Sequence, residues 1–187
     1  SEKFLIREFH ALCDGGLCMD MLTEDEKRMV TKENKLILSG VIQRAEAENA
    51  NGRFYPRPIL EREMKKYETS IKARRSLGEC DHPDRPVVEL KNASHILREY
   101  WWNGNDLMGK IEVLSTPAGQ ILRNLHEDNV PFGISSRGLG SLRNEKGKVI
   151  VEEDFGLICY DVVSEPSTAG AYLLKEGKWE KVETLIH

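Results

Sequence analysis

The sequence predicts an α+β fold, a mostly antiparallel sheet or barrel with two flanking helices. Three observations carry this prediction: several short alternating segments of strand length, an Asn-Gly-Asn turn at 103–105 between two of them, and two amphipathic segments that each begin near a proline. Alternation is typical of strands, Asn-Gly of tight hairpins, and proline of the first helical turn.

The first 34 residues differ in character from the rest and are predicted to form an N-terminal appendage. They hold a short apolar, strand-like piece from Phe4 to Phe9, a Gly-Gly turn and a charged TEDEKR stretch. The main domain is expected over residues 35–166. Residues 167–187 form a C-terminal tail, which we expect either to pack on that domain or to extend from it.

The first half of the main domain predicts a strand, a loop, a helix and a second loop. KLILSGVIQRAEA alternates as a strand does, and NANGRFYP is a loop because of its Asn-Gly and its prolines. Pro58 opens the helix ILEREMKKYETSIKARR. LGECDHPDRP is too rich in proline for anything but a loop. The expected buried stripe of the helix is Ile59, Met64, Tyr67 and Ile71.

The second half predicts a hairpin, a helix and three further strands. ASHILREYWW and DLMGKIEVLS are the two arms of the hairpin, and Pro117 begins the helix PAGQILRNLHED with Ile121, Leu122 and Leu125 inward. PFGISSRGLGSL, KGKVIVEED and GLICYDVVSEP are the later strands.

Composition argues against several classes of function. The 187 residues carry 27 Lys and Arg against 31 Asp and Glu, a net charge of −4, whereas nucleic-acid binding normally needs a basic face. No apolar run approaches the roughly 18 residues of a membrane helix, and the N-terminus has no secretory-signal pattern. The four cysteines match no CxxC spacing, so we expect reduced thiols, a cytosolic location and no metal or other cofactor.

The densest cluster of reactive side chains is residues 79–84, ECDHPD. His82 lies in a polar, proline-flanked loop that holds it rigidly and partly exposed, as a general base requires. The alternatives are a loop that only caps the preceding helix, or a metal site made by Cys80, Asp81 and His82. The metal site is disfavoured because sequence neighbours cannot all turn toward one ion.

A second cluster, GISSRGLGS at 133–141, combines small residues with a serine pair. Small residues let a ligand approach the backbone, and clustered N–H groups form oxyanion holes. On a strand Ser135 and Arg137 share one face, opposite Ile134 and Ser136, so Ser135 is accessible if Ile134 faces the core. The alternative is a Gly- and Ser-rich strand end with a bulge.

Asp161 places a charge inside the apolar strand LICYDVV. A buried carboxylate needs a partner, because desolvating it alone costs several kcal/mol. We expect a histidine or an arginine as that partner. The alternative is an edge strand whose aspartate reaches water.

Together these segments resemble one known family. NANGRFYPRPIL, GECDHPDRP, YWWNGNDLMGKIEVL and GISSRGLGSL occur in this order and spacing in the prohead core proteases of large tailed bacteriophages. The resemblance runs from Leu36 to Pro166, and its SSRGLGS block is highly specific. That family is similar in fold to the capsid maturation proteases of herpesviruses, which implies an antiparallel β-barrel surrounded by helices.

The resemblance also implies a catalytic triad. His82 matches the histidine base of the family's Gly-Glu-x-x-His-Pro motif, and Ser135 matches its nucleophile. Asp161 is our choice for the third member. Glu79 is the runner-up, since it lies three residues from His82.

Two further residues are candidates for oxyanion stabilisation because of their proximity to Ser135. They are Arg137 and Gly138, whose backbone N–H groups would face the oxyanion.

The function implied by the resemblance is a serine endopeptidase of the viral prohead that cuts after glutamate with an aliphatic residue two positions earlier. Its substrates would be prohead scaffold or core proteins, the major capsid protein and the protease itself. We expect a homo-oligomer that acts inside the prohead, in the host cytoplasm during assembly, and that binds neither nucleic acid nor membrane.

Self-cleavage is expected after Glu8, because Ile6-Arg7-Glu8 fits the preference and lies in the N-terminal appendage. The strand-like segment there would add to the substrate groove and block it, which makes residues 1–34 a possible inhibitory propeptide. A second cut is expected after Glu176 in the tail.

Two other functions compete with the protease. One is a non-catalytic, protease-like assembly module of the phage head or tail, because triad geometry is invisible in a sequence. The other is a metal-dependent hydrolase centred on Cys80, Asp81 and His82, which predicts loss of activity with chelators.

Overall fold

The structure, a computed structural model, describes residues 2–10, 21–49, 52–81, 83–164, 170–175 and 178–181. Within these residues the strands form three sheets, of five, four and three strands. In chain order the elements are β1 (Phe4–His10), α1 (Glu24–Lys32), β2 (Leu36–Arg44), β3 (Arg53–Phe54), α2 (Arg57–Lys72), β4 (Leu77–Glu79), the 3₁₀ turn η1 (Leu90–Asn92), β5 (Ala93–Asn103), β6 (Asp106–Val113), α3 (Pro117–Glu127), β7 (Gly133–Gly140), β8 (Leu142–Glu145), β9 (Lys148–Val151), β10 (Gly156–Val163), β11 (Gly170–Lys175) and β12 (Lys178–Lys181).

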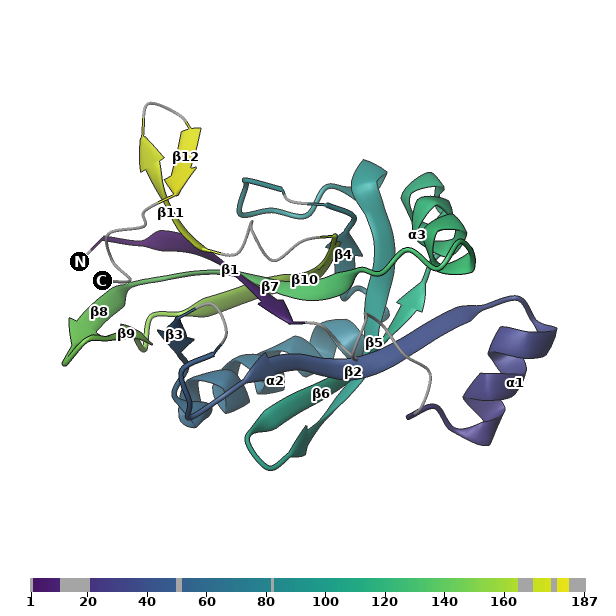
Figure 1. The fold of residues 1–187 in the computed structure, drawn as a ribbon, viewed down its shortest axis with the longest axis horizontal. Helices are drawn as coiled ribbons and strands as arrows, with labels where there is room; N and C mark the ends of the chain where they lie inside the picture. The colour runs from purple at the N-terminus through teal and green to yellow at the C-terminus, as the bar shows by residue number, and fades with distance from the viewer. Residues whose placement is uncertain are drawn as a thin grey trace.

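The largest sheet has the strand order β10-β7-β1-β11-β12 and is antiparallel throughout (Figure 1). β1 pairs with β7 along its whole length and with β11 on its other edge. Leu5 and Ile6 of β1 are fully buried. The segment that the sequence sets apart from the main domain is thus an interior strand of the largest sheet.

The four-stranded sheet, β2-β6-β5-β4, is also antiparallel. The predicted hairpin between β5 and β6 is confirmed, and its turn uses Gly104 at φ +60°, a conformation that glycine adopts without strain. β4 is a short strand in the loop predicted from LGECDHPDRP. It ends at Glu79 and is followed by a parallel bridge from Cys80 to Val162 of β10, so it links the two larger sheets.

The third sheet, β3-β9-β8, joins β3 to β9 in parallel and β9 to β8 as a hairpin. The described strands therefore form three twisted sheets, and they do not close into the barrel that the sequence favours. The predicted α+β class with mostly antiparallel pairing is confirmed.

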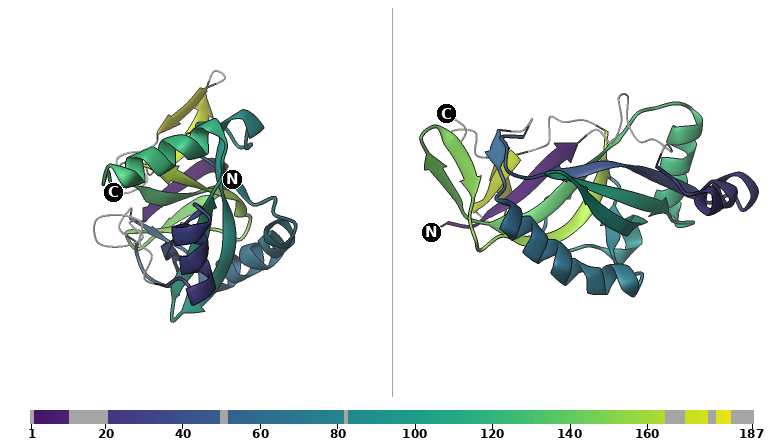
Figure 2. Two further views of the ribbon diagram at one scale, coloured as in Figure 1. Left: turned by 90° about the vertical axis from the view of Figure 1, so that its right-hand side faces the viewer. Right: turned by 90° about the horizontal axis from the view of Figure 1, so that it is seen from below.

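Three helices flank the sheets within the described residues (Figure 2). α2 packs against β5 and β10, α3 against β5 and β6, and α1 against β2. The sequence analysis missed α1, although its start carries a clear signal. The Thr23 hydroxyl accepts from the Glu26 N–H, and the Glu26 carboxylate accepts from the Thr23 N–H, which is a capping box.

The packing of α2 confirms its predicted stripe, with Ile59 and Met64 buried and the other two residues half-buried. The stripe of α3 is partly wrong, because Ile121 is 53% exposed while Leu122 is buried. A Cβ at Gly119 would lie 2.0 Å from the Leu114 carbonyl oxygen and 2.9 Å from that of Ser94 on β5, so the first turn of α3 packs too closely here for a side chain.

Two hydrophobic clusters form the core. The larger one lies between the β2–β6–β5 strands and β7 and β10, and it includes Leu38, Ile111, Ile134 and Tyr160. The smaller one joins β1 to α2 through Ile6 and Leu60. No helix among the described residues has the length and apolar character needed to cross a membrane.

Candidate active site

β7 brings the serine block to the centre of the largest sheet. Ser135 lies directly opposite Asp161 on β10 and opposite Phe9 on β1. Directly opposed residues of antiparallel strands project to the same face, so Ser135, Arg137 and Asp161 share one face. The predicted alternation along β7 is therefore confirmed.

Ser135 is nevertheless buried, with 3% of its surface exposed, so the expectation that it is accessible is wrong for this conformation. The sequence argument assumes that one face of β7 meets solvent, but both faces are covered. Its hydroxyl makes one weak contact, 3.4 Å from the Ser136 carbonyl oxygen. The Ser135 oxygen is thus held by no strong hydrogen bond in the described structure.

Arg137 is the centre of a buried ionic cluster on this face. Its guanidinium is fully buried and donates to Glu79 Oε2 at 2.9 Å and to Asp161 Oδ1 at 3.1 Å. It also donates to the carbonyl oxygens of Arg85 at 2.7 Å and Val87 at 3.0 Å. Burial lowers the pKa of the Arg137 guanidinium, but the neighbouring Cys159, Asp161 and Glu79 side chains outweigh it, so that the pKa is raised. The two Nη groups of Arg137 are thus engaged, whereas its Nε makes no hydrogen bond.

Asp161 has the predicted arginine partner. Its Oδ1 accepts from the Glu79 backbone N–H at 3.0 Å, from Arg137 Nη2 and from the Cys159 thiol. Its Oδ2 lies 2.9 Å from Arg137 Nε but makes no hydrogen bond there, since the N–H points elsewhere. Burial raises the pKa of the Asp161 carboxyl, opposed by Arg137 and the Glu79 N–H. One carboxylate oxygen of Asp161 is therefore left to accept a hydrogen bond.

Glu79, the other candidate for the third position, has both oxygens occupied. Its Oε1 is bound by Arg85, and its Oε2 accepts from Arg137 and from the Glu89 N–H. The side chain is 1% exposed. This saturation favours Asp161 over Glu79 as the carboxylate that orients an imidazole.

His82 lies outside the described residues, but both of its neighbours in sequence are placed. The Asp81 N–H donates to the Val162 carbonyl at 2.8 Å, and the Pro83 carbonyl accepts from Arg7 Nη1 at 3.0 Å. Val162 follows Asp161 directly on β10. The backbone on either side of His82 is thus attached to the sheet that carries Ser135 and Asp161.

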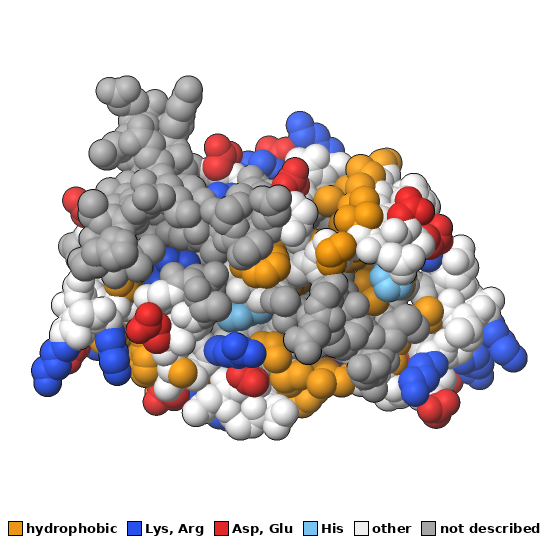
Figure 3. Space-filling model, in the orientation of Figure 1, with side chains coloured by type: hydrophobic (Ala, Val, Ile, Leu, Met, Phe, Trp, Pro, Cys, Tyr) orange, Lys and Arg blue, Asp and Glu red, His pale blue; other side chains and the backbone are white. Residues whose placement is uncertain are grey.

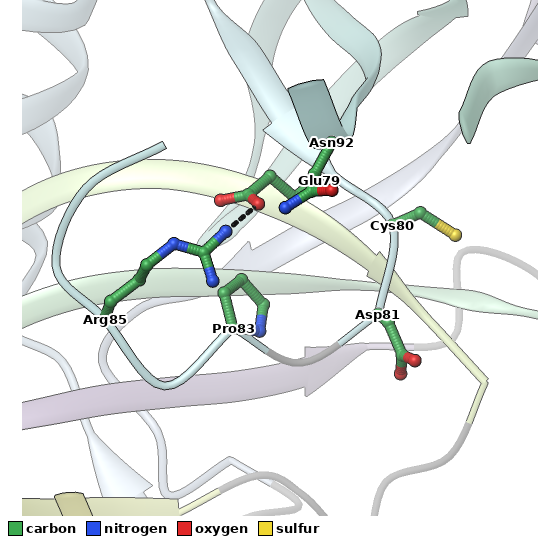
Figure 4. A pocket seen from close by; sticks show the side chains of 6 residues that line it. All are labelled: Glu79, Cys80, Asp81, Pro83, Arg85 and Asn92. Carbon is green, nitrogen blue, oxygen red and sulfur yellow. Dashed lines mark hydrogen bonds and ion pairs between the residues drawn. The ribbon is translucent and has the colours of Figure 1, made fainter. Parts of the chain in front are cut away.

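A pocket of about 340 Å³ opens at this loop. Its lining residues are Glu79, Cys80, Asp81, Pro83, Arg85 and Asn92. Figure 4 shows the side chains of Glu79 and Arg85 turned toward each other, while the Cys80 thiol points away from them. Burial and the nearby carboxylates of Asp81 and Asp161 raise the pKa of the Cys80 thiol, which keeps it protonated at neutral pH.

A second, more apolar pocket of about 220 Å³ lies on the other side of the same loop. It is bounded by Cys80 and Asp81, by Ile121, Leu122 and Leu125 of α3, and by the end of β10. Ile121, the exposed residue of α3, is part of its wall. Figure 3 shows hydrophobic side chains gathered on this face over the α3 end of the molecule.

Gly138 has a packing role in the structure. It is paired on both edges, with Ile6 of β1 and Leu157 of β10, so its backbone groups face neighbouring strands. A Cβ at this position would lie 2.5 Å from the Phe155 ring, which accounts for the glycine. β10 has a bulge between Leu157 and Cys159, opposite this point.

Glu8 lies on the opposite face of β1 and is fully buried. It is ion-paired with Arg53, and it accepts from Tyr55 Oη at 2.9 Å and from Asn49 Nδ2 at 3.1 Å. The expectation that Glu8 sits in an accessible appendage is therefore wrong. Glu176, the second expected cleavage site, lies outside the described residues.

The sequence analysis also missed Arg7, Arg53 and Tyr55 as members of buried polar clusters. A signal for Arg7 was present, because the apolar strand FLIREFH contains two charges. The same signal drew attention to Asp161 in LICYDVV. Among the described residues, no group of three or more His, Cys, Asp or Glu side chains is arranged to hold a metal ion.

Comparison with known proteins identifies the family. Residues 7–180 match the family described as prohead core protein serine protease. A relative, the prohead core protein protease of Enterobacteria phage T4, is 37% identical over 144 residues, which cover 74% of this chain and 68% of the relative. The match to the family includes β1 from Arg7 onward and α1, which lie outside the segments of the sequence resemblance.

A solved structure supports the same assignment. The bacteriophage T4 capsid assembly protease, gp21, superimposes with a TM-score of 0.72 at 31% identity, covering 89% of this chain and all of that one. The chain belongs to the prohead core protein serine protease family.

Proposed function

We propose that this protein is a serine endopeptidase of a phage prohead, with Ser135 as the nucleophile, His82 as the general base and Asp161 as the carboxylate that orients the base. Family membership supports a peptidase. The observation that carries the assignment is the cross-strand pairing of Ser135 with Asp161. In addition, Asp161 Oδ1 accepts from the backbone N–H of Glu79, the last residue of β4, three residues before His82.

The mechanism follows acyl-transfer chemistry. His82 would take the proton from Ser135 Oγ as that oxygen attacks the scissile carbonyl carbon, and would return it to the leaving amine. Asp161 Oδ2, the oxygen without a hydrogen bond, would accept from the imidazole N–H, fix its tautomer and stabilise the imidazolium. Ser135 is buried, so it must become accessible before a peptide reaches it.

The proposed substrates are the scaffold or core proteins and the major capsid protein of the prohead, cut after glutamate. The printed names of the T4 relatives, a prohead core protein protease and a capsid assembly protease, support this substrate class. We place the enzyme inside the prohead as a homo-oligomer, formed in the host cytoplasm. Self-cleavage is assigned to Glu176 in preference to Glu8, because Glu8 is buried in an ionic cluster.

A fluorophosphonate probe tests the nucleophile. Wild-type protein should be labelled, Ser135→Ala should lose both labelling and cleavage, and the matched control Ser136→Ala should keep both. Ser136 Oγ is buried on the opposite face without a hydrogen-bond partner, so its removal costs little. Labelling that persists in Ser135→Ala, or that vanishes in Ser136→Ala alone, contradicts the assignment. Absence of labelling in every variant supports the non-catalytic assembly module.

Replacing each candidate carboxylate by its isosteric amide tests whether Asp161 or Glu79 is the third member of the triad. Asp161→Asn should lower kcat by roughly 10⁴-fold, the effect of removing the orienting charge in serine protease triads. Glu79→Gln should lower it far less, because Glu79 acts on Arg85 and Arg137. The reverse order of the two effects would transfer the role to Glu79. Activity that falls with chelators would favour a metal-dependent hydrolase instead.

A further inference from the structure

Two arginines stand side by side on one face of the largest sheet. Arg7 of β1 and Arg137 of β7 are direct cross-strand partners, and both are buried. Each donates to the same loop: Arg7 Nη1 to the Pro83 carbonyl at 3.0 Å, and Arg137 Nη1 to the Arg85 and Val87 carbonyls at 2.7 and 3.0 Å. Every second carbonyl from 83 to 87 is therefore held by an arginine from the sheet.

The backbone of this loop makes few hydrogen bonds. Pro83 and Pro86 have no N–H to donate. In the described part of the chain, no hydrogen bond between backbone groups involves residues 83–88. Its position therefore depends on side chains that reach it, chiefly Arg7, Arg137 and the Glu79–Arg85 pair.

The loop begins beside the proposed base. Asp81, on one side of His82, is fastened to β10 through its N–H, and Pro83, on the other side, is fastened to β1 through Arg7. β10 carries Asp161, and β1 is the neighbour of the strand that carries Ser135. The Arg7 contact is the tie that connects the residue after the base to the sheet.

We infer that Arg7 is a positioning residue for the reaction, which holds the Pro83 carbonyl and thereby restrains the backbone next to the base at position 82. The inference rests on the proposed function, since it needs His82 and Ser135 in their roles. It gives β1, the strand that carries Arg7, a role in positioning the active site. Cleavage after Glu8 would then separate Arg7, which the enzyme needs, from the rest of the chain.

The test compares Arg7→Met with a matched arginine in the full-length protein. Arg62 is that control, because its Nη2 also binds a backbone carbonyl, that of Phe155, at 2.7 Å, outside the loop at 83–89. Small displacements of a catalytic group cost up to roughly 100-fold in rate. We expect Arg7→Met to lower kcat and the rate of fluorophosphonate labelling by about 10- to 100-fold, with KM within about twofold. Arg62→Met should leave both rates unchanged.

Two further variants separate positioning from loss of structure. Arg7→Lys, whose ammonium can still donate to a carbonyl, should recover part of the lost rate. Arg7→Gln is too short to reach Pro83 and keeps a polar group. If Arg7→Met does not fold, Arg7→Gln is judged by the same criteria, with hydrogen exchange expected to rise at Glu89, whose N–H donates to Glu79 Oε2.

The outcomes distinguish this inference from the proposed function. A folded Arg7→Met or Arg7→Gln with wild-type kcat and labelling overturns the role of Arg7, even when Ser135→Ala is inactive. An equal loss in Arg62→Met also overturns it, since the effect would then be general. An active Ser135→Ala would instead refute the proposed function.

Discussion

Glu8 and Arg53 form a fully buried ion pair that joins β1 to β3. Arg53 also donates to the Arg7 carbonyl oxygen at 3.1 Å, and Tyr55 completes the coordination of the glutamate. The carboxylate raises the pKa of the Arg53 guanidinium against the effect of burial. The N-terminal strand is thus attached to the loop before α2 by charge as well as by its sheet partners.

Removing one charge of this pair should destabilise the fold strongly. Glu8→Gln leaves Arg53 as an uncompensated buried charge, which typically costs about 3–5 kcal/mol. At about 2–4 °C per kcal/mol for a chain of this size, Tm should fall by roughly 10 °C in thermal unfolding followed by circular dichroism. Glu8→Gln combined with Arg53→Met should recover most of the loss.

The exposed pair Arg44–Asp106 provides the control for that measurement, because both side chains are at least 40% exposed. Asp106→Asn should cost less than about 1 kcal/mol. A Glu8→Gln protein as stable as Asp106→Asn would show that the buried pair contributes nothing.

The Glu8–Phe9 peptide bond should stay intact in the folded enzyme. A protease needs an extended, accessible substrate, and Glu8 is fully buried and paired with Ser136 of β7. Intact-mass measurement of active wild-type protein should therefore show no species that begins at Phe9. Arg53→Met removes the ion-pair partner of Glu8 and leaves Glu8 itself in the chain, so this variant should show a species that begins at Phe9. Arg53→Met combined with Ser135→Ala should show no such species. Wild-type protein that matures to Phe9 with full activity would contradict this prediction and the role of Arg7.

Gly78 should not tolerate a side chain. A Cβ there would lie 1.9 Å from the Tyr160 carbonyl oxygen and 2.3 Å from His95 Nε2, both rigid parts of the interior. Overpacking of this kind costs about 1–3 kcal/mol or more, so Gly78→Ala should lower the urea midpoint clearly. Gly156→Ala is the matched control, because the nearest atom to its Cβ would be 3.9 Å away. Equal midpoints for the two variants would mean that β4 can move away from β10.

Stability should fall as pH drops from about 6.5 to 4, and His95 contributes to that fall. His95 is fully buried between the Ser94 hydroxyl and the Tyr160 carbonyl, and burial lowers its pKa from 6.5 to about 4. The unfolded chain therefore binds the proton first, so the contribution is complete above pH 6.5 and is lost below it. Each unit of pKa shift corresponds to about 1.4 kcal/mol, which makes the loss on the order of 3 kcal/mol.

His95→Gln isolates this contribution. Glutamine can still donate to the Tyr160 carbonyl but does not titrate, so its urea midpoint should depend less on pH between 6.5 and 4. His10, whose pKa burial lowers to about 3, is present in both proteins and cancels in the comparison. Parallel pH profiles for wild type and variant would show that His95 is not neutral in the folded state.

The fold was predictable where local chemistry decides it. Asn-Gly turns, prolines at helix starts and alternating strands act within a few residues, and they located the β5–β6 hairpin, α2, α3 and β7. β1 could be recognised as a strand but not as an interior one, because its neighbours β7 and β11 lie more than 100 residues away in sequence. Sheet order is a property of long-range packing, which a single sequence does not reveal.

In the candidate site, too, local sequence predicted some features and long-range packing decided the others. The charge inside LICYDVV pointed to a buried aspartate with an arginine or histidine partner, and Arg137 is that partner. The side-chain contacts of Arg137 were not predicted, because its nearness to Ser135 in sequence suggested only a backbone role at the oxyanion. Its true partners, Glu79 and the carbonyls of the loop, become visible when β4 and β10 are brought together.

The place of β1 between β7 and β11 also has a consequence for when the enzyme can work. Phe4–His10 are synthesised more than 100 residues before their partners at 133–140 and 170–175. Such distant pairings fold slowly and late, because the long connecting chain must be ordered before its ends meet. The sheet that presents Ser135 therefore completes its pairing only after residues 170–175 have been made, so the site proposed around Ser135 cannot form on a shorter nascent chain.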